Sequence, residues 1–355
     1  MHQSRRWIWI VSLASTLVLA LVVGGCAPQP SSETEQAQPT AAEPSSSLES
    51  TDALGPMPEP EDNPTTPEKV ALGHQLYYDT RLSADGSRSC YSCHVCEHGL
   101  TDGKPVAEGA LGKVLTRSSP SLWNIGYHTE FYWDGRAPTM ERQAMAAWTG
   151  ANMSANAEEI VATLNGIEAY REQFQAVFGE DATADNVVKA ISAYERDALI
   201  CDDTAYDRWQ RGDVSGMSES AMRGAELFVS KAGCGNCHSG SLFTDMKYHN
   251  VGVGMDAEEP DLGRFAVTQE DADRGAFKTP SLRDIARSAP YFHNGSVATL
   301  EEAVDFMVGG GLDNPYLDTE NLKPVDLTAE EKADLIAFLE ALNCPCDLPA
   351  PELPE

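Results

Sequence analysis

The sequence has little positive charge. It contains 25 lysines and arginines against 55 aspartates and glutamates, which gives a formal net charge of −30 over 355 residues. Nucleic acids and anionic membrane surfaces also carry negative charge, so both repel such a chain. The composition therefore argues against nucleic-acid binding, and it suits either a basic protein partner or a salty habitat.

The sequence also lacks an alternating strand pattern of any length. Helical signals are present instead. Thr66 stands where an N-cap residue begins a helix, and Thr328 and Glu331 have the spacing of a capping box. Residues 154–179 and 183–199 follow the helical period. These patterns predict an all-α fold.

The chain opens with two arginines and a short apolar run, Trp7–Val23, which is typical of an export signal. The following "VVGGC" resembles the lipobox of bacterial lipoproteins, in which the cysteine becomes the lipidated first residue. We therefore predict a signal peptide over residues 1–25 and lipidation at Cys26. An ordinary signal peptide with an incidental cysteine is the alternative.

The segment that follows the predicted lipid anchor is rich in Pro, Ser, Glu, Gln and Ala and has almost nothing to bury. Such a composition predicts a disordered tether over residues 26–60. We expect the protein in the periplasm, held to a membrane through the lipid anchor alone. The outer membrane is the first choice.

Cysteine, by contrast, is plentiful. The pattern C-x-x-C-H occurs twice, as "CYSCH" at Cys90–His94 and as "CGNCH" at Cys234–His238. C-x-x-C-H is the attachment pattern of c-type haem, in which both thiols form thioethers and the histidine becomes an iron ligand. A dithiol redox site would not require the histidine twice, and zinc needs four ligands. We predict two covalent haems c. The attachment residues are Cys90, Cys93, Cys234 and Cys237, and the proximal iron ligands are His94 and His238.

The two motifs lie in what looks like a duplicated module. Each follows a glycine, a leucine–aromatic pair and a loop. We predict two cytochrome c-like domains, each wrapped around one haem, over residues 61–212 and 213–343. The tail, residues 328–355, is expected to pack back on the N-terminal domain.

Four further cysteines, Cys96, Cys201, Cys344 and Cys346, form an even set. In an exported protein this suggests two disulfides with three connectivities. Cys344 and Cys346 flank a proline and are too close for an easy mutual bond, so we expect one of them to reach Cys201 or Cys96. A free, reactive Cys96 near the haem is the alternative.

Four long segments carry a resemblance to a known family: residues 76–94, 119–144, 223–254 and 277–307. In content and order they are similar to the bacterial dihaem cytochrome c peroxidases. That family includes the enzyme that matures methylamine dehydrogenase by oxidising tryptophans in a partner protein. The likeness spans residues 64–343.

The resemblance implies a division of labour between the two haems. The haem at His94 would be the peroxide side and the haem at His238 the electron-transfer side. Met307 matches the sixth iron ligand of the second haem, and His/Met ligation raises the reduction potential of an iron. Trp133 matches a tryptophan between the haems, which implies an electron relay. The family's interdomain calcium would use Ser118, Ser288 and Pro290, although serine is a weaker ligand than the usual asparagine at the first position.

Two departures from the family pattern bear on activity. The family histidine that caps the peroxide haem falls at Ala110, 16 residues after His94, so the first iron is expected to be open at rest. The family also places a glutamine and, ten residues later, a glutamate over the open iron face. Gln143 matches the glutamine, but Met153 stands at the glutamate position. Met153 is either a packing residue or a ligand of the first iron.

Five other histidines and one glutamate also have expected roles or positions. His128 and Glu130 are candidate substitutes for the missing acid, and His249 and His293 are expected to form structural hydrogen bonds near the second haem. His98 is expected at the surface, and His74 to face solvent or the end of its helix.

Three functions follow from these patterns. The first is reduction of hydrogen peroxide to water by electrons from a small c-type cytochrome or cupredoxin. The second is oxidation of aromatic residues in a partner protein. The third, favoured by the missing glutamate, is a dihaem electron carrier without turnover. A homodimer is a further candidate assembly.

Overall fold

The computed structural model describes residues 54–355. The predicted signal peptide, Cys26 and most of the predicted tether therefore lie outside the described residues. Within the described part, no helix is both long enough and apolar enough to cross a membrane.

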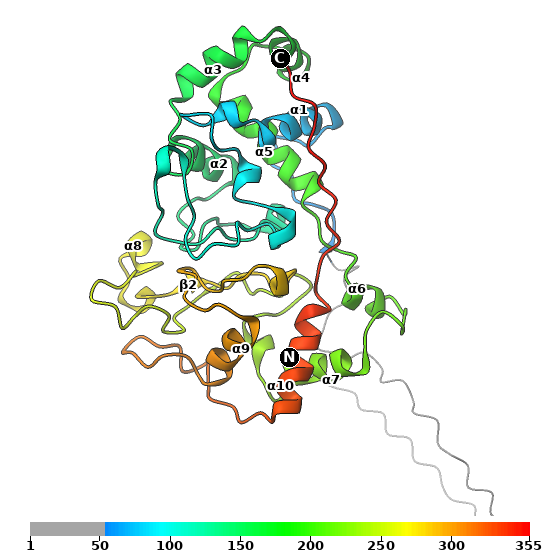
Figure 1. Ribbon diagram of the computed structural model, residues 1–355, viewed down its shortest axis with the longest axis vertical. Helices are drawn as coiled ribbons and strands as arrows, with labels where there is room; N and C mark the ends of the chain where they lie inside the picture. The colour runs from blue at the N-terminus through cyan, green and yellow to red at the C-terminus, as the bar shows by residue number, and fades with distance from the viewer. Residues whose placement is uncertain (1–53) are drawn as a thin grey trace, which may run out of the picture. The chain divides into compact units, whose positions relative to one another are not determined.

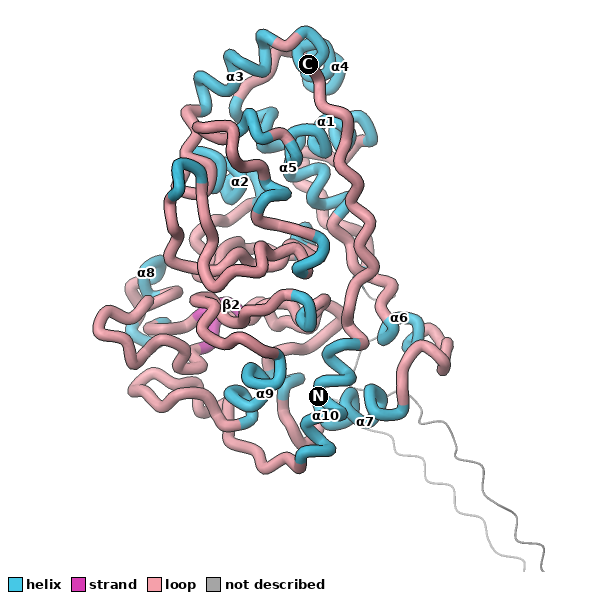
Figure 2. Tube along the Cα trace, in the orientation of Figure 1, coloured by secondary structure: helices cyan, strands magenta, loops and turns pink. Residues whose placement is uncertain are grey.

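Helices are the main regular secondary structure of the described residues, as the sequence predicts, and long loops connect them (Figures 1 and 2). The strands amount to one antiparallel ladder in which Tyr248 pairs with Lys278 and His249 with Phe277. The α-helices and strands in chain order are α1 (Pro67–Tyr78), α2 (Met140–Thr149), α3 (Ala157–Gly166), α4 (Glu168–Phe178), α5 (Ala184–Ala198), α6 (Ala205–Gln210), α7 (Glu219–Val229), β1 (Tyr248–His249), α8 (Phe265–Thr268), β2 (Phe277–Lys278), α9 (Leu300–Val308) and α10 (Ala329–Glu340).

The predicted helix starts are confirmed. The Thr66 side chain accepts a hydrogen bond from the backbone N–H of Lys69. Thr328 and Glu331 form the predicted capping box at the start of α10. Each cap satisfies backbone N–H groups that the first helical turn leaves without partners.

Two large hydrophobic cores are present, one for each half of the described chain, and Phe131, Ala137 and Met140 form a third, small cluster. The first is built from α1 to α5, and the second from α6, α7, α9 and α10. Tyr206 and Trp209 on α6 are buried in the second core. The predicted boundary after residue 212 would place them in the N-terminal domain, whereas the change from the first core to the second falls between Cys201 and Tyr206.

The same helix crossing organises both cores. Gly73 on α1 lies against the backbone carbonyl of Ala190 on α5, and Gly224 on α7 lies against the backbone carbonyl of Asp334 on α10. A side chain at either glycine would overlap that carbonyl oxygen, so only glycine lets the two helices approach this closely. The glycine of the duplicated sequence module is therefore the contact point of each domain.

The C-terminal tail divides its contacts between the domains. Helix α10 packs on α7 in the C-terminal domain, and only the residues beyond it reach the N-terminal domain. There the Tyr78 hydroxyl donates to the Leu348 carbonyl at 2.6 Å, and His74 Nε2 lies 2.9 Å from the Pro349 carbonyl oxygen. The ring of His74, which was expected to face solvent or the end of its helix, therefore contacts the tail. The tail is seen as a loop alongside α1 and α5 in Figure 2.

Two disulfides fix this tail. Cys344 is joined to Cys201, and Cys346 is joined to Cys96. We expected one of the two tail cysteines to reach the N-terminal domain, and in the structure both do. Cys96 is not a free thiol.

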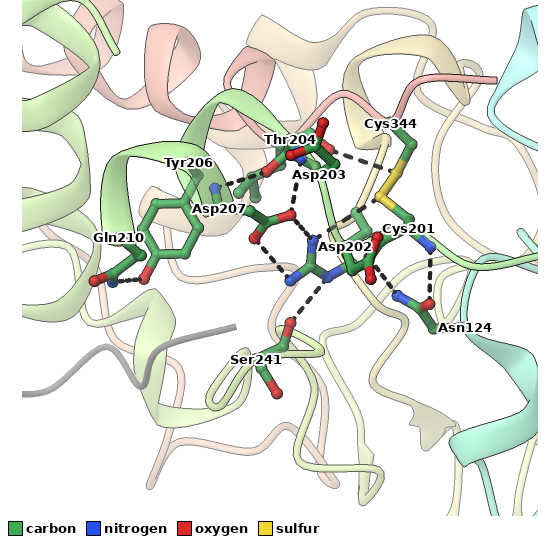
Figure 3. A network of polar contacts seen from close by, with 12 residues as sticks. Asn124, Cys201, Asp202, Asp203, Thr204, Tyr206, Asp207, Gln210, Ser241 and Cys344 are labelled. Atoms are coloured by element: carbon green, nitrogen blue, oxygen red, sulfur yellow. Dashed lines mark hydrogen bonds and ion pairs between the residues drawn. A yellow bond between two sulfur atoms is a disulfide. The ribbon is translucent and has the colours of Figure 1, made fainter. Parts of the chain in front are cut away.

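A buried ion pair lies beside the Cys201–Cys344 bond. Arg283 donates to both carboxylate oxygens of Asp207, at 2.8 and 3.1 Å, and both side chains are fully buried. Figure 3 shows Asp207, the disulfide and Asn124, whose side chain exchanges two hydrogen bonds with the backbone of Cys201. These bonds hold the segment between α5 and α6 in place.

The predicted tether extends too far. Within residues 26–60, the Gly55 carbonyl accepts a hydrogen bond from the Tyr127 hydroxyl at 3.0 Å. Met57 packs against the bare backbone of Gly126. The last residues of the predicted tether therefore belong to the folded domain, because Gly126 leaves space for an apolar side chain.

Candidate haem sites and the contact between them

Each C-x-x-C-H motif begins with a short 3₁₀ turn, Cys90–Ser92 after α1 and Cys234–Asn236 after α7. All four motif cysteines are free thiols, while the other four described cysteines are paired. Burial raises the pKa of the Cys234 thiol to about 11, and it raises the pKa of the Cys90 thiol further. Each site thus offers two neighbouring unpaired cysteines, the number that thioether attachment of one haem requires.

The two motif histidines are oriented in the same way. His94 Nδ1 lies 3.0 Å from the Leu100 carbonyl oxygen, and His238 Nδ1 lies 3.0 Å from the Phe243 carbonyl oxygen. Burial lowers the pKa of both imidazoles, so each ring is neutral. A proton on Nδ1 leaves the Nε2 lone pair available to a metal, and the carbonyl fixes the ring orientation.

The two accepting carbonyls belong to strained residues. Leu100 has φ of 58° and Phe243 has φ of 53°, in the left-handed region that non-glycine residues rarely adopt. Such a conformation costs on the order of 1–3 kcal/mol and persists where the surrounding structure enforces it. Both side chains are fully buried. The chain therefore bears strain at the same point in both domains in order to position the histidine.

These features fit a covalent haem at each site. The residues offer two thiols and one neutral imidazole with a free Nε2, the complete attachment set. In the first site, the Tyr77 hydroxyl and Arg88 Nε are buried and have no hydrogen-bond partner among the described residues. Buried polar atoms without partners are rare in folded proteins, and they mark places where a further group belongs.

An internal repeat extends beyond the haem motifs, and our reading of the sequence missed it. Residues 120–125 ("PSLWNI") and 280–285 ("PSLRDI") match, as do 131–139 ("FYWDGRAPT") and 291–299 ("YFHNGSVAT"). Tyr132 and Phe292, at equivalent positions, both have positive φ, of 70° and 69°. The repeated "PSL" and the glycine–threonine spacing are the signals that could have revealed it.

The repeated segments form the contact between the domains. The Ser118 backbone N–H donates to the His293 carbonyl at 2.7 Å, and the Lys278 backbone N–H donates to the Trp133 carbonyl at 2.8 Å. Trp133 and His293 are equivalent in the repeat, and so are Ser118 and Lys278. The indole N–H of Trp133 donates to the Ser118 carbonyl at 3.0 Å. Trp133 is thus held by both domains at their contact.

The residues matched to a calcium site make hydrogen bonds within the chain. The Ser118 hydroxyl donates to the Phe292 carbonyl at 2.9 Å, and the Ser288 hydroxyl donates to the Ile285 carbonyl at 3.0 Å. Calcium binding at these residues and Pro290 stays a prediction.

Met307 lies in the last turn of α9 and is half-buried. Two other residues of this helix, Leu300 and Val304, pack against the second core, whereas Met307 is absent from that part of the described core. By the internal repeat, the equivalent position on α2 is Ala147. A thioether is thus offered by one domain and has no counterpart in the other.

The departures in the first domain have structural accounts. Met153 is 6% exposed and belongs to the first core, which supports its reading as a packing residue. Ala110 is fully buried, and its N–H donates to the Asn152 carbonyl at 2.8 Å. Gln143 lies on α2, half-buried, and its carbonyl accepts from the Tyr132 hydroxyl at 3.2 Å.

Neither candidate substitute acid suits that role. Burial raises the pKa of Glu130, but hydrogen bonds from Tyr248 and Arg264 outweigh this and hold its pKa below the usual range. Burial and the nearby ammonium of Lys278 lower the pKa of His128 to about 3. At neutral pH both groups are therefore already deprotonated.

The other histidines have structural contacts. His249 lies between Asp318 (2.6 Å) and Asp245 (3.0 Å), and its contacts with Cys237 and these carboxylates raise its pKa to about 10. Cys237, Asp245 and His249 are close enough to hold a metal, but a thioether at Cys237 assigns this group to the haem site. His293 stacks on Phe277 with ring centroids 3.6 Å apart, in place of the expected side-chain hydrogen bond. His98 is exposed, as expected.

Comparisons with known proteins agree with this geometry. A model of the di-haem cytochrome c peroxidase family matches residues 67–215. The methylamine utilization protein MauG of Methylorubrum extorquens is 39% identical over 302 residues, covering 84% of this chain and 85% of that protein. Cytochrome-c peroxidase IdrP1 of Denitromonas iodatirespirans is 38% identical, covering 82% and 85%. The crystal structure of a MauG-like protein associated with microbial copper homeostasis is 35% identical, with a TM-score of 0.75, and covers 82% of this chain and 93% of that one.

Proposed function

Because the chain belongs to the di-haem cytochrome c peroxidase family, we propose that it reduces hydrogen peroxide to water with electrons from a small c-type cytochrome or a cupredoxin. Several relatives are cytochrome-c peroxidases, so the protein is an oxidoreductase of this kind. The two haems c that the family implies would supply the redox chemistry when bound.

The two sites have different tasks in this proposal. Met307 is assigned, with His238, to hold the haem iron that the C-terminal site would bind, because a His/Met pair would favour the high reduction potential that suits acceptance of electrons from a donor. The N-terminal site, with Ala110 where the family has a capping histidine and Gln143 on α2, is the peroxide side. Gln143 is assigned to orient peroxide there.

The observation that carries the proposal is the position of Trp133. Its carbonyl accepts from Lys278 of the C-terminal domain, and its indole donates to Ser118, which itself is bonded to His293. An aromatic ring held by both domains is a suitable relay between two redox sites. The same rigid contact keeps the two sites at a constant separation.

The proposal also covers the location of the protein and a bound calcium ion. Export and lipidation at Cys26 would place the protein in the periplasm, anchored to a membrane. A calcium ion at Ser118, Ser288 and Pro290 would brace the same domain contact. Loss of activity on chelation, with recovery on adding calcium, is the test of that ion.

Steady-state consumption of peroxide with a reduced c-type cytochrome tests the activity. We expect turnover that depends on both the donor and peroxide. The proposal is contradicted if the donor is oxidised equally fast without peroxide, or if the rate of peroxide loss does not depend on the donor. A Trp133→Phe variant should bind both haems and turn over more slowly.

A second function is favoured by one observation, the 39% identity with a methylamine utilization protein. In this alternative the oxidised N-terminal site removes electrons from aromatic residues of a partner protein. A third reading, a dihaem carrier, is favoured by the core position of Met153 where the family has a glutamate. Two low-spin ferric haems without peroxide turnover would establish the carrier.

A further inference from the structure

The equivalence of the two helix crossings allows the haem domains to be compared residue by residue. Four residues after each crossing glycine stands an aromatic residue, Tyr77 on α1 and Phe228 on α7. The partner helices align through the carbonyls that the glycines touch. Five residues further along, α5 has Glu195 and α10 has Leu339.

The chemistry of this pair differs between the domains. In the C-terminal domain Phe228 and Leu339 are 1% and 7% exposed and are ordinary members of the second core. In the N-terminal domain Tyr77 and Glu195 are 0% and 6% exposed. Burying a carboxyl and a phenol where a leucine and a phenylalanine suffice is costly, so the polar pair needs a functional reason.

The Tyr77 hydroxyl has no hydrogen-bond partner among the described residues. Burial raises the pKa of Tyr77, and the charge of Glu195 raises it further, so the two groups are within electrostatic reach of each other. The Cys90 thiol responds to burial and then to Glu195 in the same way. The pair therefore lies beside Cys90, which anchors the porphyrin edge at the first site and is not an iron ligand.

Few charged groups near Glu195 disfavour the protonated form of its carboxyl group. Burial raises its pKa to about 8, with Arg196 lowering it and Glu141 raising it by smaller amounts. Arg196 is engaged elsewhere, since it pairs with Glu141 at 3.2 Å and donates to the Asn63 carbonyl at 2.9 Å. The remaining titratable groups facing this region are Tyr77 on α1, Tyr194 on α5 and Cys90. Burial raises the pKa of each of them, so all three are neutral.

We propose that Glu195, together with Tyr77, is the proton reservoir of the first haem site and replaces the acid that is missing between residues 142 and 157. This inference rests on the proposed function. Reduction of one hydrogen peroxide to two waters consumes two electrons, which the donor protein supplies, and two protons. Glu195 gives one of these protons, becomes a carboxylate, and regains a proton from solvent before the next turnover. The buried Tyr77 hydroxyl lies within electrostatic reach of this carboxyl and modulates its proton affinity.

The first test is independent of activity. In the infrared spectrum of the holoprotein, we expect a carboxylic acid C=O band that disappears as pH rises, with a midpoint near 8. Glu195→Gln should remove this band while keeping both haems. Tyr77→Phe, which installs the residue of the C-terminal domain, should keep the band and shift its midpoint. Ser192→Ala is the matched control, because it also deletes a buried hydroxyl on α5 that has no hydrogen-bond partner among the described residues, and it should leave peroxide turnover and its pH profile unchanged.

The second test is the pH profile of peroxide turnover. Wild-type turnover should fall above about pH 8, as the reservoir empties. A single acid–base group contributes about 10²–10⁴ in rate, so Glu195→Gln should lower turnover by about 100-fold or more and flatten this limb. Tyr77→Phe should lower turnover by a smaller factor.

A band that persists in Glu195→Gln, or a wild-type protein without such a band, overturns the inference. So does a Glu195→Gln enzyme with wild-type turnover and profile. If Glu195→Gln does not assemble with haem, the Tyr77→Phe variant provides the test. An unshifted midpoint of the infrared band together with full turnover in that variant contradicts the pairing of Tyr77 with Glu195. If the wild type shows the band but no peroxide turnover, the proposed function fails, and the infrared test of the proton on Glu195 stands apart from it.

Discussion

The two haem domains share one framework and differ in what lines it. Both cross a pair of helices at a glycine, and both hold the motif histidine against the carbonyl of a strained, buried residue. The C-terminal domain adds Met307 and has Phe228 and Leu339 beside the crossing, whereas the N-terminal domain has Ala147 in place of the methionine. The first domain instead buries Tyr77 and Glu195. In the proposed function, a few substitutions in a common framework would separate an electron-accepting site from one equipped for protons.

The domains also differ in how they are anchored. Both disulfides attach the tail to the N-terminal domain, through Cys96 and Cys201. The C-terminal domain is instead held by the buried pair of Arg283 and Asp207. The covalent restraints thus lie on the side whose core contains unsatisfied polar atoms, and the disulfides offset part of the cost of that polarity.

The largest expected effect comes from breaking the framework in one domain at a time. Gly73→Ala and Gly224→Ala each place a methyl group on a backbone carbonyl that cannot move without separating the two helices. We expect a loss of more than about 4 kcal/mol in the affected domain. Mass spectrometry of the haem-bearing peptides should show loss of haem at Cys90 in the first variant and at Cys234 in the second.

Gly166→Ala at the end of α3 is the matched control, because no atom lies within 4 Å of the added methyl group. It should retain both haems. If all three variants lose haem equally, or if neither crossing variant loses haem, the crossings do not organise the two domains.

The next largest effect concerns the difference in reduction potential between the two haem sites. Met307→Ala should lower the reduction potential of the C-terminal site and reduce donor-driven turnover to background, because the thioether that favours the reduced iron is gone. Haem content should be unchanged. A redox titration and a donor assay measure the two effects. Val304→Ala, on the same helix but packed in the core, is the control. Wild-type potential and turnover in Met307→Ala would reject the ligand assignment.

Much of this framework could be predicted from the sequence, since the haem motifs and helix caps are short-range patterns. The α6 boundary and the packing of Met57 could not, because each depends on space left by distant residues. The disulfide connectivity depends on a tail whose path no local pattern gives. Glu195 was missed because it stands in an ordinary helical period, and only the equivalence with Leu339 shows that a leucine would serve for packing.

Smaller effects are expected from the covalent restraints. Cys344→Ser opens a disulfide that spans 143 residues, and it should lower the free energy of unfolding by about 2–5 kcal/mol. Cys346→Ser frees the Cys96 thiol, three residues after Cys93, to compete for that cysteine before haem attachment. Haem content at the first site should then fall, while the second site stays full.

The double variant Cys96→Ser, Cys346→Ser removes the competing thiol together with the disulfide. It should restore full haem content at the first site, as measured on the separated haem peptides. If the double variant loses as much haem as Cys346→Ser, the tail restraint rather than thiol competition controls attachment.

The smallest expected effect is a change in how stability varies with pH. The pKa of Glu195 in the folded protein, about 8, lies above the ordinary glutamate value of about 4.3 in the unfolded chain. Between these values the folded state holds a proton that the unfolded state has lost, so stability falls as pH rises until about pH 8. Glu195→Gln cannot lose this proton, so its denaturation midpoint should vary less with pH over that window. Leu339→Met, the control at the equivalent position, should keep the wild-type slope. Parallel slopes for wild type and Glu195→Gln would mean that Glu195 is already ionised in the folded domain.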